Sequence, residues 1–282
     1  MDGVGAVGNI VAITGGARGI GRATAHACLR SGMRVAIGDI DADEVARTAA
    51  ELGDGVLGIP FDVRDPDAFA AFLDRAEDQL GRLDVLINNA GVAPIGLFVD
   101  EDPADTQRLL DINLGAVLTG TRLALQRFLP RGNGHIVNVA SSAGQIATAG
   151  GATYAATKHG VVGFTRAIRA ETRGTGVRTT IVMPGLIRTD MIKGFAKGRG
   201  VRIVGPDAVG DAIVGAVRTG REEVFVPREM GPVARLIAGS PPALGDRLKR
   251  LINADSIMAA ADMSARVDYR RRMADSVGNP PR

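Results

Sequence analysis

The sequence has no tryptophan and a single cysteine among its 282 residues, and aromatic residues make up only 4% of it. One thiol, Cys28, cannot form an internal disulfide, so a disulfide-stabilised fold is excluded and a reducing, cytoplasmic location is expected. No run reaches the ~18 apolar residues that a membrane span requires. The first seventeen residues contain neither Lys nor Arg and no apolar block, so no signal peptide is expected.

The chain also has no large excess of positive or negative charge, because its net charge is only +3. From residue 240 onward there are 8 basic and 5 acidic residues, which leaves 26 of each in the rest of the chain. A nucleic-acid partner would require a broad basic face rather than a basic tail, so nucleic-acid binding is not expected. The 45% hydrophobic content and 38 glycines suit a tightly packed α/β protein.

A glycine-rich turn follows the first apolar run. Residues 10–14 predict a buried parallel strand, and T-G-G-A-R-G-I-G at 14–21 leads into an Ala-rich helix that continues to about Arg30. Glycines let the backbone approach a pyrophosphate, and a helix N-terminus offers it free N–H groups. The segment therefore predicts a phosphate site, although its glycine spacing departs from G-x-G-x-x-G and a plain strand-to-helix turn remains the alternative.

An acidic residue ends the second predicted strand. The strand at 33–38 stops at Asp39, about 20 positions past the glycine turn, where a carboxylate can bind the adenosine ribose hydroxyls. The same charge would repel a 2′-phosphate, and the next residues, Ile40 and Asp41, are not basic, so NAD is favoured over NADP. Arg18 points the other way if it reaches a 2′-phosphate; otherwise it is a solvent-facing loop charge.

Strands and helices alternate along most of the chain. We expect strands at 10–14, 33–38, 55–61, 83–87, 135–140, 177–183 and 223–227, with helices at 42–52, 66–80 and 103–129 and a helix from the Tyr154 segment to about Arg173. This alternation predicts a doubly wound parallel sheet, the Rossmann fold, in a single domain. Such sheets bind ligands outside the carboxyl ends of their strands. The residues at or just past those ends are Gly15, Asp39, Asp62, Asn89, Ser141 and Pro184.

Tyr154 and Lys158 lie four residues apart on one face of a predicted helix. A tyrosine with its ordinary pKa of ~10 is a poor base at neutral pH, and a nearby cation is expected to lower that pKa. Ser141 can hold the oxygen of an alcohol or ketone while Tyr154 takes or gives its proton.

With these positions assembled, the chain resembles the short-chain dehydrogenase/reductase family from residue 8 to about 228. The matching elements are T-G-G-A-R-G-I-G at 14–21, Asp39, Asp62-Val63, N-N-A-G at 88–91, Asn113, Ser141, Y-A-A-T-K at 154–158 and P-G-L-I-R-T at 184–189. The resemblance implies a catalytic tetrad of Asn113, Ser141, Tyr154 and Lys158. The cofactor residues that it implies are Gly15, Arg18, Gly19, Ile20, Gly21, Asp39, Ile40, Asp62, Val63, Asn89, Ala90, Gly91, Tyr154, Lys158, Pro184, Gly185, Ile187 and Thr189.

The resemblance also implies individual roles. Asp62 would bond the adenine amino group, Lys158 the nicotinamide ribose, and Ile187 and Thr189 the carboxamide, while Asn113 would anchor a water. No metal is needed, and the three histidines at 26, 135 and 159 are interpreted as structural. The expected activity is NAD-dependent hydride transfer between the cofactor and a secondary alcohol or ketone. The alternatives are an NADP-dependent 3-oxoacyl reductase and a catalytically silent dinucleotide-binding regulator.

Two regions are harder to interpret. Residues 186–205 predict a mobile substrate loop whose five basic residues favour either an anionic substrate group or a solvated surface. An apolar, steroid-like or long-chain substrate is expected from a lining of Val92, Ile95, Ile146, Leu186 and Phe195.

We expect a catalytic domain at 1–228 and a helical extension at 229–282, which packs on the loop or on a neighbouring subunit; membrane contact is less expected. The resemblance implies a homodimer or homotetramer.

Overall fold

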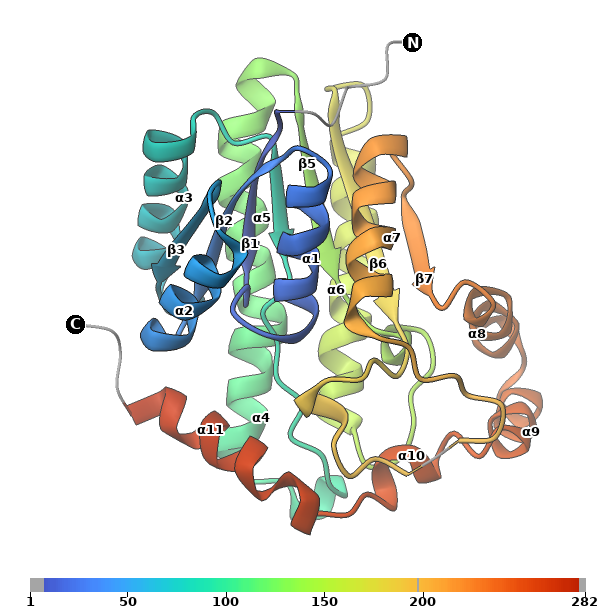
Figure 1. Cartoon of the computed structure of the whole chain (residues 1–282). Helices are drawn as coiled ribbons and strands as arrows, with labels where there is room; N and C mark the ends of the chain where they lie inside the picture. The colour runs from blue at the N-terminus through green and yellow to red at the C-terminus, as the bar shows by residue number, and fades with distance from the viewer. Residues whose placement is uncertain (1–7, 197, 279–282) are drawn as a thin grey trace.

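The computed structural model describes residues 8–196 and 198–278, which form a parallel sheet covered by helices on both faces (Figure 1). The seven strands are hydrogen-bonded in the order β3-β2-β1-β4-β5-β6-β7, and every pairing is parallel. Their bounds are β1 Ile10–Thr14, β2 Arg34–Asp39, β3 Val56–Pro60, β4 Val85–Asn88, β5 Gly134–Val139, β6 Val177–Pro184 and β7 Glu223–Val226. The prediction of a doubly wound parallel sheet is confirmed.

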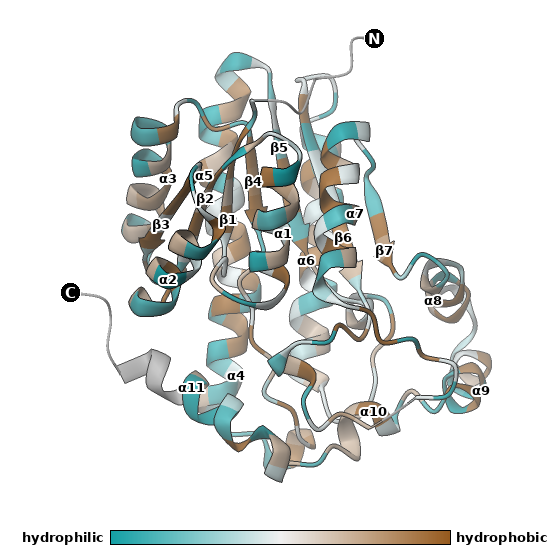
Figure 2. Ribbon diagram, viewed as in Figure 1, coloured by the Kyte–Doolittle hydropathy of each residue, from teal (hydrophilic) through white to brown (hydrophobic). Residues whose placement is uncertain are grey.

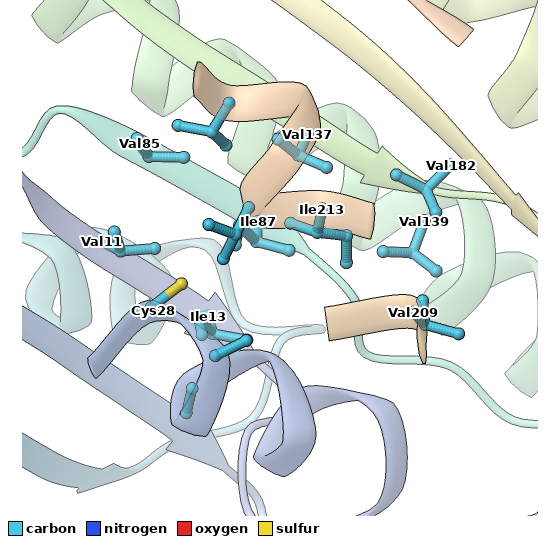
Figure 3. Close-up of a cluster of buried hydrophobic side chains, with 14 of the residues drawn as sticks. Val11, Ile13, Cys28, Val85, Ile87, Val137, Val139, Val182, Val209 and Ile213 are labelled. Carbon is cyan, nitrogen blue, oxygen red and sulfur yellow. The ribbon is translucent and has the colours of Figure 1, made fainter. Parts of the chain in front are cut away.

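Alternate residues of each strand supply the two halves of the core. In β1, Val11 and Ile13 pack with helices α1 (Gly19–Arg30), α2 (Ala42–Leu52) and α7 (Pro206–Thr219), as Figure 3 shows in part. Ile10 and Ala12 face the opposite side, with α3 (Pro66–Leu80) and α5 (Ala116–Phe128). Helix α6 (Ala152–Glu171) covers the β6 end of that side. The sheet is therefore apolar on both faces, as the brown strands in Figure 2 show.

The helix predicted over 103–129 is interrupted. Helix α4 covers Pro103–Leu110, a π-helical turn covers Asp111–Gly115, and α5 follows. Asn113 lies in the π-helical turn, where its side chain leaves the helix surface and binds the loop that follows β4. Helix α7 was not predicted, although Pro206 occupies its first turn and Gly220 ends it in a left-handed conformation.

The C-terminal segment forms short helices at the end of the molecule to which the strands point (Figure 1). They are α8 Met230–Gly239, α9 Pro242–Leu251, α10 Ser256–Ala259 and α11 Val267–Gly278, so the segment expected to be helical consists of several short helices. Backbone hydrogen bonds join this segment to the 186–205 loop: Ala196 N–H donates to the Ile257 carbonyl at 3.0 Å, and Asp262 N–H to the Gly194 carbonyl at 2.8 Å. None of the helices in the described part of the chain is long and apolar enough to cross a membrane.

Candidate active site

A cavity of about 920 Å³ lies at the carboxyl edge of the sheet. Its walls come from the segments that follow β1 to β6 and from the C-terminal segment. The volume is at the upper end of the range for small-molecule and cofactor sites. The location is the one expected for an open α/β sheet, because the strand order reverses between β1 and β4.

The glycine turn after β1 approaches the end of β4 closely. Gly15 has φ +63°, and a Cβ there would lie 2.8 Å from the Ala90 Cα. A Cβ on Gly21 would lie 2.0 Å from the Gly15 carbonyl oxygen. Helix α1 begins at Gly19 without a side-chain cap, so its first N–H groups face the cavity edge unpaired by a capping side chain. Only glycines allow this backbone arrangement, which suits a pyrophosphate.

Asn89 joins the two segments. Its Nδ2 donates to the carbonyl oxygens of Thr14 and Gly15 at 2.9 and 3.0 Å. In return, the Thr14 hydroxyl accepts from the backbone N–H groups of Asn89 and Ala90, both at 3.0 Å. This predicted cofactor residue therefore also holds the glycine turn in place.

Asp39 lies at the end of β2, where its carboxylate accepts from the N–H of Ala17 at 3.2 Å and of Asp41 at 3.4 Å. Burial raises the pKa of this carboxyl, and the two backbone hydrogen bonds oppose the rise. Arg18 is bound by two acids, at 2.7 Å from Asp41 and 3.1 Å from Glu44. The guanidinium is thus already engaged beside the place where an adenosine ribose would lie.

Asp62 at the adenosine side is paired with Arg64, which the sequence analysis did not single out. The Arg64 Nε lies 3.0 and 2.9 Å from the two carboxylate oxygens. Both residues line the cavity. The pairing leaves lone pairs on the carboxylate, so Asp62 can still accept a hydrogen bond from an amino group.

Ser141, Tyr154 and Lys158 come together where the cavity meets helix α6. All three are buried, and Ser141 hydrogen-bonds the Tyr154 hydroxyl. The Ser141 Oγ also accepts from the Ala143 N–H at 3.1 Å, which orients it. The Lys158 ammonium donates to the Val139 carbonyl at 3.1 Å and lies 5.9 Å from the centre of the Tyr154 ring.

The pKa of Tyr154 moves in the direction opposite to the one expected from the sequence. Burial raises it, with the Ser141 hydrogen bond opposing, and burial lowers the pKa of Lys158 to about 8. The expectation considered only the nearby cation, whereas loss of water disfavours both charged forms.

Asn113 lies behind the cavity rather than on its wall. Its Oδ1 accepts from the Val92 N–H and its Nδ2 donates to the Val92 carbonyl, both at 2.9 Å. A Cβ on Gly91 would lie 3.1 Å from the Asn113 Oδ1 and 3.6 Å from the Lys158 Nζ. The π-helical turn thus brings Asn113 to the loop after β4, close to the lysine, in agreement with the frequent use of such turns at functional sites.

Every predicted catalytic or cofactor residue lines this cavity except Asn113 and Gly21, which pack directly behind it. Of the five apolar residues expected around the substrate, Ile95 does not line the cavity. The sequence analysis missed the contribution of the C-terminal segment, which matched no motif. Its cavity-lining residues are Glu229, Met230, Val233, Ile252, Ala254, Ile257, Met258, Tyr269, Arg272 and Met273.

The basic residues of the 186–205 loop are partly neutralised. Lys193 lies 2.6 Å from Asp190, and Arg202 lies 3.6 Å from Glu229. Lys197, which contributed to the same prediction, lies outside the described residues. These pairs favour a charged loop surface over a dedicated site for an anion.

The histidines lie apart from the site. His135 is buried and bonds the Thr180 hydroxyl at 2.8 Å, and burial lowers its pKa to about 4. His159 bonds the Ala155 carbonyl at 2.9 Å, and His26 contacts Arg30. Within residues 8–196 and 198–278, no three His, Cys, Asp or Glu side chains are grouped as a metal site would require.

Comparison with solved structures finds the same architecture. A short chain dehydrogenase/reductase from Burkholderia phymatum, solved in complex with NAD, superposes with a TM-score of 0.77 at 25% identity. The match covers 83% of this chain and 94% of the other.

The names of several similar proteins also indicate oxidoreductases. The "Probable oxidoreductase EphD" of Mycobacterium tuberculosis is 38% identical over 74% of this chain, which spans only 39% of that protein's length. The "1-deoxy-11-beta-hydroxypentalenate dehydrogenase" of Streptomyces exfoliatus is 39% identical over 67% of this chain and 70% of its own length. The "3-alpha-(or 20-beta)-hydroxysteroid dehydrogenase" of M. tuberculosis is 36% identical over 66% and 71%. Because the family model for short chain dehydrogenases also matches residues 9–200, the chain belongs to the short-chain dehydrogenase family of oxidoreductases.

Proposed function

We propose that this protein is an NAD-dependent oxidoreductase that interconverts an apolar secondary alcohol and its ketone. The observation that carries the proposal is the buried group of Ser141, Tyr154 and Lys158. These residues line the same cavity as the glycine turn after β1 and the apolar residues of the 186–205 loop. A proton donor and acceptor, an orienting hydroxyl and a cation are the groups that this redox step requires from a protein.

The chain's own residues would do the following. Ser141 holds the oxygen of the alcohol, and Tyr154 as phenolate removes its proton; in reduction the phenol returns the proton to the ketone oxygen. Lys158 supplies the positive charge that favours the phenolate, and Asn113 holds the Val92 backbone beside them. The nicotinamide dinucleotide, when bound, accepts or supplies the hydride at the carbinol carbon. The glycine cradle at Gly15 and Gly21 fits its pyrophosphate.

NAD is proposed over NADP on two grounds. Asp39 places a carboxylate where the adenosine ribose is expected, and a 2′-phosphate there would meet its negative charge. Arg18, the nearest candidate for neutralising such a phosphate, is held by Asp41 and Glu44. The solved relative that binds NAD supports the same choice.

The substrate class follows from the wall of the cavity. Val92, Ile146, Leu186 and Phe195 line it together with apolar residues of the C-terminal segment. Relatives named for a hydroxysteroid and a hydroxypentalenate support a compact, largely apolar carbon skeleton. We propose that residues 1–228 form the catalytic domain and that residues 229–282 form an extension that packs on it. The extension closes the substrate half of the cavity, which is the part lined by Val92, Ile146, Leu186 and Phe195.

A dimer or tetramer is also proposed. Helices α5 and α6 share an exposed apolar groove, lined by Leu118, Thr121, Arg122, Leu125, Gln126, Leu129, Pro130, Phe164 and Ile168. Replacing Leu125 and Phe164 with Ser is expected to yield monomers in light scattering, and an unchanged mass would exclude this face as the interface.

The activity is tested by following NADH formation with a panel of apolar secondary alcohols, with NADP in parallel and Tyr154→Phe as control. Turnover with NAD that the substitution abolishes is the expected result. Turnover with NADP alone would overturn the cofactor proposal and favour a 3-oxoacyl reductase. NAD binding without turnover of any alcohol or ketone would favour a dinucleotide-binding regulator.

A further inference from the structure

The chain has only two tyrosines, and both line the same cavity. Tyr154 comes from α6, and Tyr269 comes from α11 at the far end of the sequence. The Tyr269 hydroxyl accepts a hydrogen bond from the Ala93 N–H at 2.8 Å. Its burial raises its pKa to about 12, and the charge of a Tyr154 phenolate adds to this rise, so the two hydroxyls lie within electrostatic reach of each other.

Arg266 holds Tyr269 in this position. Its side chain is fully buried, and its guanidinium donates to the carbonyls of Met191, Lys193 and Ala93 at 2.7, 2.9 and 2.7 Å. Its carbon Cζ also lies 4.9 Å from the centre of the Tyr269 ring, a cation–π contact. One buried cation therefore ties α11 to the segments after β4 and β6 that border the substrate half.

The Tyr269 hydroxyl can still donate a hydrogen bond. A phenol can accept and also donate, and here the accepting side is taken by the Ala93 N–H. Leaving aside residues 273–278, no oxygen in the described part of the chain accepts the proton of this hydroxyl in return. Apolar residues of the same C-terminal segment, Met258, Ile257 and Met273, line the cavity with it, while Arg266 and Arg272 are the charges nearby. A half-buried donor that lines a largely apolar cavity is the kind of group that orients a ligand.

We propose that Tyr269 is a substrate-binding residue that donates a hydrogen bond to a second oxygen of the substrate, remote from the carbinol that Ser141 and Tyr154 handle. The substrate is then an apolar secondary alcohol that carries a further carbonyl or hydroxyl group, and Arg266 is the positioning residue for this contact. The inference rests on the proposed function and narrows its substrate class.

The test uses the full-length protein and two fused-ring secondary alcohols. One carries a keto group on the ring farthest from the alcohol, and the other has a methylene there. The wild type is expected to prefer the keto alcohol. Tyr269→Phe keeps the ring on Arg266 and removes the hydroxyl, so kcat/KM for the keto alcohol should fall about tenfold or more, mainly through KM. For the plain alcohol the fall should be smaller than threefold.

Arg270→Gln is the matched control, because Arg270 is exposed on the same helix and does not line the cavity. It should leave the preference between the two alcohols unchanged. An equal loss on both alcohols in Tyr269→Phe would assign Tyr269 a purely structural role and overturn the inference alone. A wild type that binds NAD but oxidises neither alcohol, nor any other in the panel, would overturn the proposed function and this inference with it.

Discussion

Cofactor choice should change without any substitution of Asp39, the carboxylate proposed to bind the ribose. Arg18 lies at the cavity edge, held by Asp41 at 2.7 Å and Glu44 at 3.1 Å. The double substitution Asp41→Asn/Glu44→Gln removes both acidic partners and keeps the side-chain shapes. Asn at position 41 can still cap α2, where the Asp41 Oδ1 now accepts from the Glu44 N–H at 3.0 Å. The helix should therefore stay intact while Arg18 becomes free to meet a 2′-phosphate.

The expected gain follows from the exposure of the pair. The Arg18 side chain is 42% exposed, so each ion pair contributes only about 0.2–1 kcal/mol. Releasing both corresponds to about 0.4–2 kcal/mol, which is about a 2- to 30-fold rise in kcat/KM with NADP. Removal of two negative charges acts in the same direction. Asp39 remains, so NAD should still be the better cofactor.

The assay is initial-rate kinetics with the best alcohol and either cofactor. The ratio of kcat/KM for NADP to that for NAD should rise, with less than a twofold change for NAD itself. Glu51→Gln is the control, because it frees Arg22 from a 2.7 Å ion pair between the same two helices at a position away from the cavity. If the double variant changed both cofactors by the same factor, or if Glu51→Gln raised the ratio equally, Arg18 would have no part in the selection.

Three further predictions concern the site. Burial raises the pKa of Tyr154 above its ordinary value of about 10, so kcat/KM for alcohol oxidation should still be rising with pH at about pH 10; a profile that is flat between about pH 7 and pH 10 would contradict its role as the base. Gly21→Ala would place a Cβ 2.0 Å from the Gly15 carbonyl, and NAD affinity measured by calorimetry should drop at least about tenfold, whereas unchanged affinity would remove the glycine turn from the cofactor site. Arg266→Met leaves one buried and two part-buried carbonyls without their donor, so urea unfolding should show a loss of about 2–5 kcal/mol; wild-type stability would mean that the guanidinium is not what ties the segments together.

Elements with local signals were predicted from the sequence with correct bounds. Helices α2 and α3 begin after Asp41 and Asp65, whose carboxylates accept from backbone N–H groups of the first turn. They end at Gly53 and Gly81, both with positive φ. Caps of this kind depend only on neighbouring residues, so a single sequence contains the information.

Other features depend on contacts between distant residues. The π-helical turn around Asn113 is stabilised by hydrogen bonds to Val92, and no pattern within 103–129 signals it. The hydrogen bond between Tyr269 and Ala93 joins residues 176 positions apart. The direction of the Tyr154 pKa was also wrong, because the depth of burial of a side chain is set by the whole fold rather than by its neighbours in sequence.

The proposed reacting groups and much of the apolar wall of the cavity come from different parts of the chain. The groups proposed to carry the reaction all lie before residue 190, within the range that the family model matches, whereas much of the apolar wall and the second tyrosine come after residue 250. The two sets are joined by the hydrogen bonds of Arg266, the Tyr269–Ala93 hydrogen bond, the Arg272–Asp190 ion pair and backbone hydrogen bonds. A segment that keeps these contacts can therefore vary in its cavity-lining residues while the reacting groups stay constant. Exchange of the last fifty or so residues between homologues would then transfer substrate preference and leave the proposed catalytic residues unchanged. Such exchanges would allow one fold to acquire new substrates.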